Sequence, residues 1–186
     1  MSICQVEHFL TTFLDHLLWK SHTFIWSQRM TIFSDIARGL EYIHNFSVEN
    51  FIHRDIKASN VLLDHNLRAK VSDFGLVKPA KDADKLVTST FARTFGYLAP
   101  ECSIQLPEER LSMTHYLSYQ NYRVPIFRNS VVDKNLFKIV DPRLHLSNEA
   151  WNNLLQVAYL AHQCTATEPS GRPDMNECFS WLTRVG

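Results

Sequence analysis

The chain has 186 residues, of which 45% are hydrophobic and 20% charged, and this composition is typical of one soluble globular domain. Its 19 basic and 19 acidic residues balance without any long run of like charge, which argues against a protein that binds nucleic acid or acidic lipid. The four cysteines form no C-x-x-C pair, so the sequence favours a reducing compartment over a zinc site or a disulfide framework.

The first 25 residues are interpreted as a segment that precedes the main domain. Two acidic residues and two histidines interrupt the apolar positions near its start: Glu7, His8, Asp15 and His16. Because a signal peptide or a membrane-spanning helix needs an uninterrupted apolar run, neither is predicted here. We therefore expect the chain as given to be soluble and cytoplasmic.

A long amphipathic helix is predicted over residues 26–45. Apolar side chains recur there at helical spacing, while Asp35, Arg38 and Glu41 fall on other faces. The apolar positions are Ile32, Phe33, Ile36, Leu40 and Ile43. One face of this helix should therefore be buried.

A β-hairpin is predicted after this helix. Residues 61–63 and 67–71 are short apolar runs, and the turn formers at 64–66 separate them. If the two runs pair in antiparallel fashion, Asn60 and Asp73 both lie at the open end of the hairpin. Two oxygen-bearing side chains would then converge there.

The rest of the chain is predicted to contain loops followed by a helix. Residues 82–90 are polar without periodicity and predict a surface loop, and residues 106–130 are similarly irregular. From Trp151 to His162, apolar residues return at helical spacing and predict a helix that residues 165–173 end.

Three short motifs lie between positions 53 and 101. They are His-Arg-Asp-x-Lys-x-x-Asn at 53–60, Asp-Phe-Gly at 73–75 and Ala-Pro-Glu at 99–101. In residue type, order and spacing they resemble the signature set of protein kinases. Eleven residue types match, and each has a chance of roughly one in twenty, so coincidence does not explain the group.

The chemistry of these residues agrees with the resemblance. Phosphoryl transfer from ATP needs metal ions that neutralise phosphate charge and a carboxylate that orients the attacking hydroxyl. Mg²⁺ prefers hard oxygen ligands, which Asn60 and Asp73 can supply together. Asp55 can accept the proton of the substrate hydroxyl, and Lys57 can meet the transferring phosphoryl group. ATP and Mg²⁺ are therefore the expected cofactors.

The resemblance also implies specificity and regulation. Lys57, two residues after Asp55, resembles the serine/threonine class of protein kinases. Arg54 resembles the arginine that pairs, in many kinases, with a phosphorylated residue of the activation loop. A structural role in contacting the acceptor segment is favoured for Thr94. The candidate phosphorylation sites are Thr88, Ser89, Thr90 and Thr94.

Longer phrases narrow the resemblance to plant receptor-like kinases, closest to the transmembrane subfamily with leucine-rich-repeat ectodomains. The phrases lie at 26–29, 36–44, 51–55, 68–71, 73–78, 140–144 and 172–175. The resemblance covers most of residues 14–182 and implies a plasma-membrane parent with a cytosolic kinase domain. It also implies a protein substrate or a partner kinase. Arg172 resembles a late arginine that pairs with the motif glutamate, here Glu101, in a structural role.

The implied fold is the carboxy-terminal lobe of a kinase, mainly α with a small β-hairpin. Residues 1–25 would be a remnant of the helix before this lobe, and residues 26–101 its catalytic core. An irregular junction at 102–130 would lead into a helical subdomain at 131–186. His53 is expected to have a structural role through backbone hydrogen bonds.

Two departures from the family qualify this resemblance. No Gly-x-Gly pair occurs, and no Val-Ala-Ile-Lys strand precedes residue 53, so the amino-terminal lobe is expected to be missing. After Glu101 the sequence does not match the central buried helix of the family, and about thirty residues are expected to be missing there by comparison with the family's usual length.

Three interpretations of function remain open. The first is a serine/threonine kinase by family, inactive as this chain alone because adenine and phosphate binding depend on the missing lobe. The second is a kinase-derived module that engages a partner kinase without catalysis. The third is a truncated or mis-spliced product of a receptor-like kinase gene, which the junction near Cys102 favours.

Overall fold

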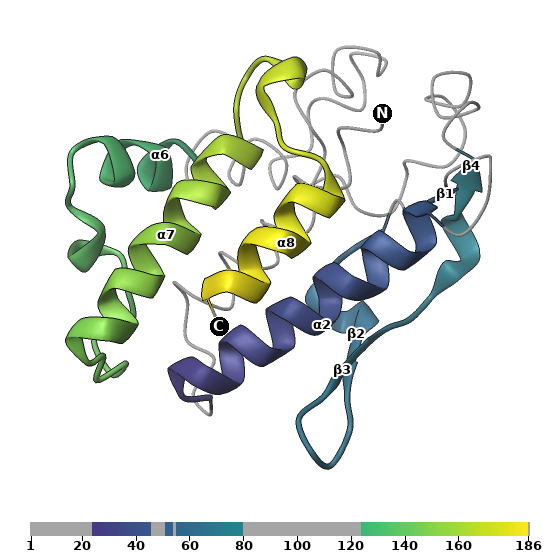
Figure 1. Cartoon of the computed structure of the whole chain (residues 1–186), viewed down its shortest axis with the longest axis horizontal. Coiled ribbons are helices and arrows are strands. Elements are labelled where there is room, and N and C mark those ends of the chain that lie inside the picture. Colours follow the sequence, from purple (N-terminus) through teal and green to yellow (C-terminus); the bar gives the residue numbers. More distant parts are fainter. Residues whose placement is uncertain (1–23, 46–50, 54, 80–123, 186) are drawn as a thin grey trace, which may run out of the picture.

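The computed structural model describes residues 24–45, 51–53, 55–79 and 124–185, and these form a mainly helical body with small antiparallel strand pairs (Figure 1). Its α-helices α2, α6, α7 and α8 span Trp26–Asn45, Val124–Val132, Asn148–Cys164 and Met175–Val185. Single turns of 3₁₀ helix lie at Ala58–Asn60, Phe74–Leu76, Leu136–Lys138 and Pro169–Gly171. A mainly α fold with a small β-hairpin is thus confirmed.

Helix α2 occupies the predicted range, and its apolar face is buried as expected. The buried apolar residues of α2 lie along one side of the helix: Met30, Ile32, Phe33, Ile36, Ala37 and Leu40. Such a stripe lets a helix bury one side while the other stays in water. In Figure 1, α2 runs beside α8 on one side and beside the β2–β3 hairpin on the other.

Helix α7 is the helix predicted between residues 151 and 162, and it is longer than predicted at both ends. It begins at Asn148 and ends at Cys164. Ser147 explains the earlier start, because its side-chain oxygen accepts a hydrogen bond from the backbone N–H of Ala150 at 3.1 Å. An N-cap of this kind satisfies one of the free amides of the first turn.

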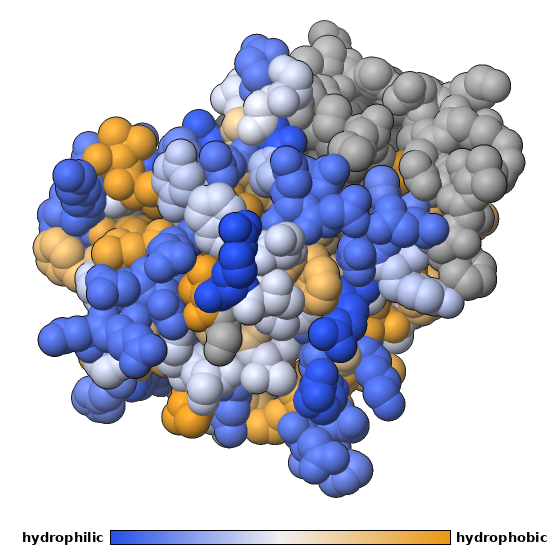
Figure 2. Space-filling view, viewed as in Figure 1, coloured by the Kyte–Doolittle hydropathy of each residue, from blue (hydrophilic) through white to orange (hydrophobic). Residues whose placement is uncertain are grey.

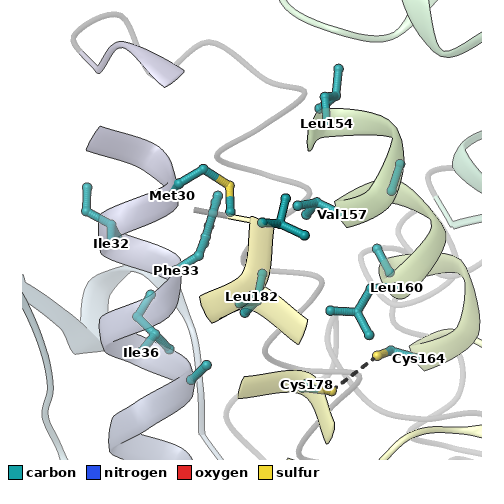
Figure 3. Packing of buried hydrophobic residues seen from close by; sticks show 14 of the residues in the cluster. Met30, Ile32, Phe33, Ile36, Leu154, Val157, Leu160, Cys164, Cys178 and Leu182 are labelled. Carbon is teal, nitrogen blue, oxygen red and sulfur yellow. Dashed lines mark hydrogen bonds between the residues drawn. The ribbon is translucent and has the colours of Figure 1, made fainter. Parts of the chain in front are cut away.

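Helices α2, α7 and α8 meet in one hydrophobic core. Figure 3 shows Phe33 of α2, Val157 of α7 and Leu182 of α8 together in it, and each of these residues is at most 1% exposed. Cys164 and Cys178 join α7 to α8 as free thiols whose Sγ atoms are 3.7 Å apart. Full burial of one large apolar side chain contributes roughly 1.5–3 kcal/mol, so this core is the main source of stability.

A buried ion pair ties α2 to the segment before α7. The Nη2 atom of Arg29 lies 3.8 Å from Oδ2 of Asp141, and the two side chains are 4% and 5% exposed. The side chain of Arg143 donates two hydrogen bonds to Asp141, at 2.9 and 3.1 Å. These hydrogen bonds hold the pKa of Asp141 below its ordinary value, so the carboxylate is charged at neutral pH.

The predicted hairpin is present with the expected pairing. Strand β2 (Val61–Leu63) pairs antiparallel with β3 (Ala69–Val71), and Val61 lies opposite Val71. In the turn, Oδ1 of Asp64 accepts hydrogen bonds from the backbone N–H groups of Asn66 and Arg68. A side chain that bonds its own following backbone in this way favours a tight reversal.

Two features differ from the sequence-based expectations. Residues 124–130 were predicted to be irregular as part of the 102–130 junction, but they form most of α6. Pro125 accounts for the misreading, since it suggests a loop and yet is tolerated in the first turn of a helix. Strand β1 (Phe51–Ile52) also pairs antiparallel with β4 (Lys78–Pro79), which the sequence did not predict.

The outer surface over the helices is mostly polar. Figure 2 shows hydrophilic residues over most of the visible face, with separate apolar residues between them. Among the described helices, none combines the length and the apolar character that crossing a bilayer requires.

Candidate active site

The backbone of the β2–β3 hairpin places the two predicted metal ligands at the same end of the hairpin. Asn60 directly precedes β2, and Asp73 follows β3 after Ser72. The backbone N–H of Ser72 donates to the carbonyl of Asn60 at 2.8 Å, and the Ser72 hydroxyl donates to the same oxygen at 3.0 Å. These bonds close the open end of the hairpin, so the chain at Asn60 and the chain entering Asp73 are neighbours.

Asp55 is the centre of a hydrogen-bonded cluster on the loop before the hairpin. Its Oδ2 atom accepts from Nζ of Lys57 at 2.7 Å and from Nδ2 of Asn60 at 3.0 Å. Asn60 Nδ2 also donates to the backbone carbonyl of Asp55 at 2.8 Å. Asp55 is only 4% exposed, so these partners hold its carboxylate in one orientation. The structure therefore brings together three of the predicted site residues.

The amide of Asn60 is oriented by this cluster. Because its nitrogen donates to Asp55, its oxygen is the atom that can face a cation. The Ser59 hydroxyl lies 3.5 Å from that oxygen, at the limit of a hydrogen bond. A neutral amide oxygen is a hard ligand of the kind Mg²⁺ accepts.

Asp73 is exposed and has a left-handed backbone, with φ 62° and ψ 70°. Aspartate tolerates this region better than most residues. One of its carboxylate oxygens accepts a long hydrogen bond, 3.4 Å, from the backbone N–H of Gly75. The turn therefore presents the carboxylate at the surface, beside the open end of the hairpin. Within the described residues, no group of three or more His, Cys, Asp and Glu side chains is placed to hold a metal ion.

His53 links the loop that carries Asp55 to the β2–β3 hairpin, in the structural role expected for it. Its Nε2 atom lies 3.0 Å from the carbonyl oxygen of Ser72, and its Nδ1 atom lies 3.3 Å from the backbone N–H of Asp55. Since a carbonyl only accepts and an N–H only donates, this pattern fits a neutral ring with its proton on Nε2. The edge of the ring contacts Phe74, with centroids 5.1 Å apart.

We expect the stability of the chain to fall as the pH drops below about 6.5, the ordinary pKa of histidine. Burial lowers the pKa of His53 in the folded state, against the opposing effects of Ser72, Asp55 and Asp73. The unfolded chain therefore binds more protons between the lowered pKa and the ordinary one, and stability is lost as pH falls through that window. Protonation would also place a second N–H against the amide of Asp55.

Urea unfolding at pH 7.5, 6.5 and 5.5 measures this effect. His53→Gln cannot titrate, so its free energy of unfolding should depend less on pH over this range than that of the wild type. The matched change His145→Gln, at an exposed histidine, should leave the pH dependence as it is. One titrating group gives a slope of at most about 1.4 kcal/mol per pH unit. Equal slopes in the wild type and His53→Gln would contradict the assignment.

The remaining predicted site residues divide into two groups. Arg172 precedes α8, and its Nε atom donates to the carbonyl of Ala166 at 2.7 Å, so it braces the turn after α7. Its pairing with Glu101 stays a prediction, because Glu101 lies outside the described residues. The proposed regulatory residues also lie outside them: Arg54, Thr88, Ser89, Thr90 and Thr94.

Comparisons with known proteins agree with the motifs. A family model described as the protein kinase domain matches residues 2–181. Receptor protein kinase WSS1 of Oryza sativa subsp. japonica is 48% identical over 180 residues, which are 86% of this chain and 20% of that protein. Receptor-like kinase TMK4 of Arabidopsis thaliana is 38% identical over 177 residues, covering 84% and 19%.

A third relative is more distant. LysM domain receptor-like kinase 3 of Medicago truncatula is 34% identical over 175 residues, which are 81% of this chain and 28% of that protein. The chain thus spans about a fifth of the length of WSS1 and of TMK4. Because the domain match covers nearly all of its residues, the chain belongs to the protein kinase family, among the plant receptor-like kinases.

Proposed function

We propose that this site is the catalytic-loop half of a protein serine/threonine kinase, in which the γ-phosphoryl group of ATP passes to a protein hydroxyl. The cluster around Asp55 is the observation that carries the proposal. The Asp55 carboxylate is 4% exposed, and its hydrogen bonds to Lys57 and Asn60 hold it in one orientation. A substrate hydroxyl could therefore bind to it in a defined position. Phosphoryl transfer depends on such positioning more than on covalent chemistry by the protein.

Each residue has a role in this proposal. Asp55 accepts the proton of the substrate hydroxyl and orients its oxygen for attack. Lys57, whose side chain is 28% exposed, bears the positive charge that meets the transferring phosphoryl group. Asn60 and Asp73 hold Mg²⁺ through oxygen atoms, and the bound ion supplies charge neutralisation for the phosphates.

Lys57 and the family together support serine and threonine as acceptors. The relatives named as receptor kinases support a protein substrate or a partner kinase, and a parent at the plasma membrane with a cytosolic kinase domain. The expected carboxy-terminal lobe agrees with the helical body and with the hairpin that carries Asn60 and Asp73.

We further propose that the 186 residues alone do not catalyse the reaction. They contain no Gly-x-Gly pair, so a loop to cover the ATP phosphates has to come from other residues. A non-catalytic interaction module is the second candidate, and one observation favours it. The hairpin and the adjoining turn leave the apolar side chains of Leu62, Leu63 and Phe74 exposed by 57%, 38% and 50%, and a second lobe or a partner kinase could cover some of them.

An ATP titration with and without Mg²⁺ tests the proposed nucleotide site, once circular dichroism has shown that the purified chain is folded. Because the loop that covers the phosphates has to come from other residues, we expect only weak ATP binding, which should depend on Mg²⁺. Asp73→Asn should weaken this binding at least about 10-fold further, because the variant loses a charged metal ligand. Asparagine also tolerates the left-handed backbone at this position, so the turn should persist.

The same change at an exposed site, Asp133→Asn, provides the control and should bind like the wild type. A folded chain that binds no ATP in Mg²⁺ would exclude a nucleotide site on this chain and favour the interaction module. Failure to fold would favour the truncated or mis-spliced product.

A further inference from the structure

A bidentate ion pair fastens the β2–β3 hairpin to α2. Arg68, at the start of β3, donates from Nε to Oδ2 of Asp35 at 2.8 Å and from Nη2 to Oδ1 at 2.5 Å. The backbone N–H of Ala69 donates to the same Oδ2 atom at 3.0 Å. Asp35 therefore holds both the side chain of one hairpin residue and the backbone of the next.

The ion pair between Asp35 and Arg68 lies where it can hold the hairpin against α2. Asp35 and Gly39 are four residues apart on α2, and residues at this spacing share one helical face. A Cβ atom at Gly39 would lie 3.4 Å from Cγ2 of Val71, so β3 approaches the helix closely there. The ion pair at the start of β3 and this close contact at its end hold the whole strand on α2.

The hairpin needs such an external support. Each of its strands has three residues, and an isolated two-stranded hairpin is marginally stable at best in water. Val61 of β2 packs against the hydrophobic core, as do Ala69 and Val71 of β3. Leu62 and Leu63 are exposed, so β2 buries only part of its apolar surface. The ion pair with α2 therefore adds a restraint on where Asn60 and the residues after β3 lie.

The electrostatics of the pair match this role. The Asp35 side chain is 10% exposed while that of Arg68 is 54% exposed, so the carboxylate is the anchored partner. The hydrogen bonds from Arg68 and then from Ala69 lower the pKa of Asp35, against the effect of its burial. The carboxylate stays charged over the pH range in which a kinase operates, and its two oxygens match the fork of the guanidinium group.

We propose that Asp35 is a positioning residue for the Mg²⁺–ATP site, which acts through Arg68 and Ala69 to fix the hairpin that carries Asn60 and Asp73. This inference rests on the proposed function of those two residues as metal ligands. It adds that affinity for the metal–nucleotide complex depends on a carboxylate of α2 that touches neither metal nor nucleotide.

Two measurements on the full chain test the inference, and the first requires no ligand. Amide hydrogen exchange at Ser72 reports whether the open end of the hairpin stays closed, because its N–H bonds the carbonyl of Asn60. We expect Arg68→Ala to speed this exchange at least about 10-fold. Arg68→Lys, which keeps the charge without the fork, should give an intermediate rate and serves if the alanine variant does not fold.

The second measurement is the ATP titration with and without Mg²⁺. We expect Arg68→Ala and Asp35→Asn each to weaken binding in Mg²⁺ by about 5- to 10-fold, and to leave binding without Mg²⁺ as in the wild type. The double variant should lose no more than the larger single loss, since both changes break one interaction. Lys70→Ala removes an exposed cation from the same strand and should change neither measurement.

The outcomes separate this inference from the proposed function. Unchanged exchange at Ser72 in Arg68→Ala would overturn the inference. Faster exchange with unaltered affinity in Mg²⁺ would also overturn it, because the pair would then hold the hairpin without positioning a site. If the wild-type chain binds no ATP in Mg²⁺, the proposed nucleotide site fails and the positioning role fails with it. The exchange rates would still show whether the pair supports the hairpin.

Discussion

Replacing Phe33 with alanine should lower the free energy of unfolding by about 3–5 kcal/mol, which is the range for a fully buried phenylalanine. Phe33 is 1% exposed and lies with Leu182 and Val157 in the core that α2, α8 and α7 share (Figure 3). Its removal costs the transfer free energy of the ring and leaves a cavity that three packed helices can fill only in part.

Urea unfolding followed by circular dichroism measures this loss, and the protein offers a matched control. Phe137 is 62% exposed, so the same change to alanine there should alter stability by less than about 1 kcal/mol. Globular domains are stable by only about 5–15 kcal/mol, so Phe33→Ala removes a large fraction of the total. Similar losses for both variants would show that the three-helix core is not the source of stability.

Removing the carboxylate of Asp141 is the second large effect that we expect. Asp141→Ala should destabilise the chain by about 3 kcal/mol, because it leaves the buried charge of Arg29 without its anionic partner. Arg29 keeps its hydrogen bond to the carbonyl of Phe24, which limits the loss. The ion pair that joins α2 to the segment before α7 would also be lost.

A double variant distinguishes the burial of an unpaired charge from a general packing defect. Arg29→Met with Asp141→Leu removes both charges and keeps apolar volume, so it should be less destabilised than Asp141→Ala alone. Urea unfolding of the wild type, Asp141→Ala, the double variant and its two single variants, Arg29→Met and Asp141→Leu, gives the comparison. If the double variant loses as much as the sum of its single changes, then the pair contributes through shape and not through charge.

Local sequence patterns predicted α2, most of α7 and the β2–β3 hairpin, each of which lies within one segment of the chain. The bounds of α2 follow from apolar spacing alone, and the pairing of Val61 with Val71 follows from two short runs around a turn. Helix α6 was missed because Pro125 suggests a loop as readily as a first helical turn. The β1–β4 pair was missed because two-residue strands carry no periodicity, and their pairing joins distant positions.

In the candidate site, too, contacts within one segment could be predicted from the sequence, whereas contacts between distant segments could not. Motif spacing predicted the roles proposed for Asp55, Lys57, Asn60 and Asp73, and the hairpin explained why the last two are neighbours. The ion pairs of Asp35 with Arg68 and of Arg29 with Asp141 join residues on separate elements. In the sequence, each of these charged residues looks like an ordinary surface residue. Only the folded structure therefore shows which of them form ion pairs.

The packing of α2 against α8 has a consequence for the order of events during synthesis. The side chains of Asn45 and Asn176, at the facing ends of these helices, form a hydrogen bond across 131 positions of the chain. At about 5–20 residues per second, roughly 7–26 seconds separate their emergence from the ribosome. During that interval the apolar face of α2 has no α8 to cover it. The nascent chain is therefore expected to bind chaperones at α2 until α8 is synthesised.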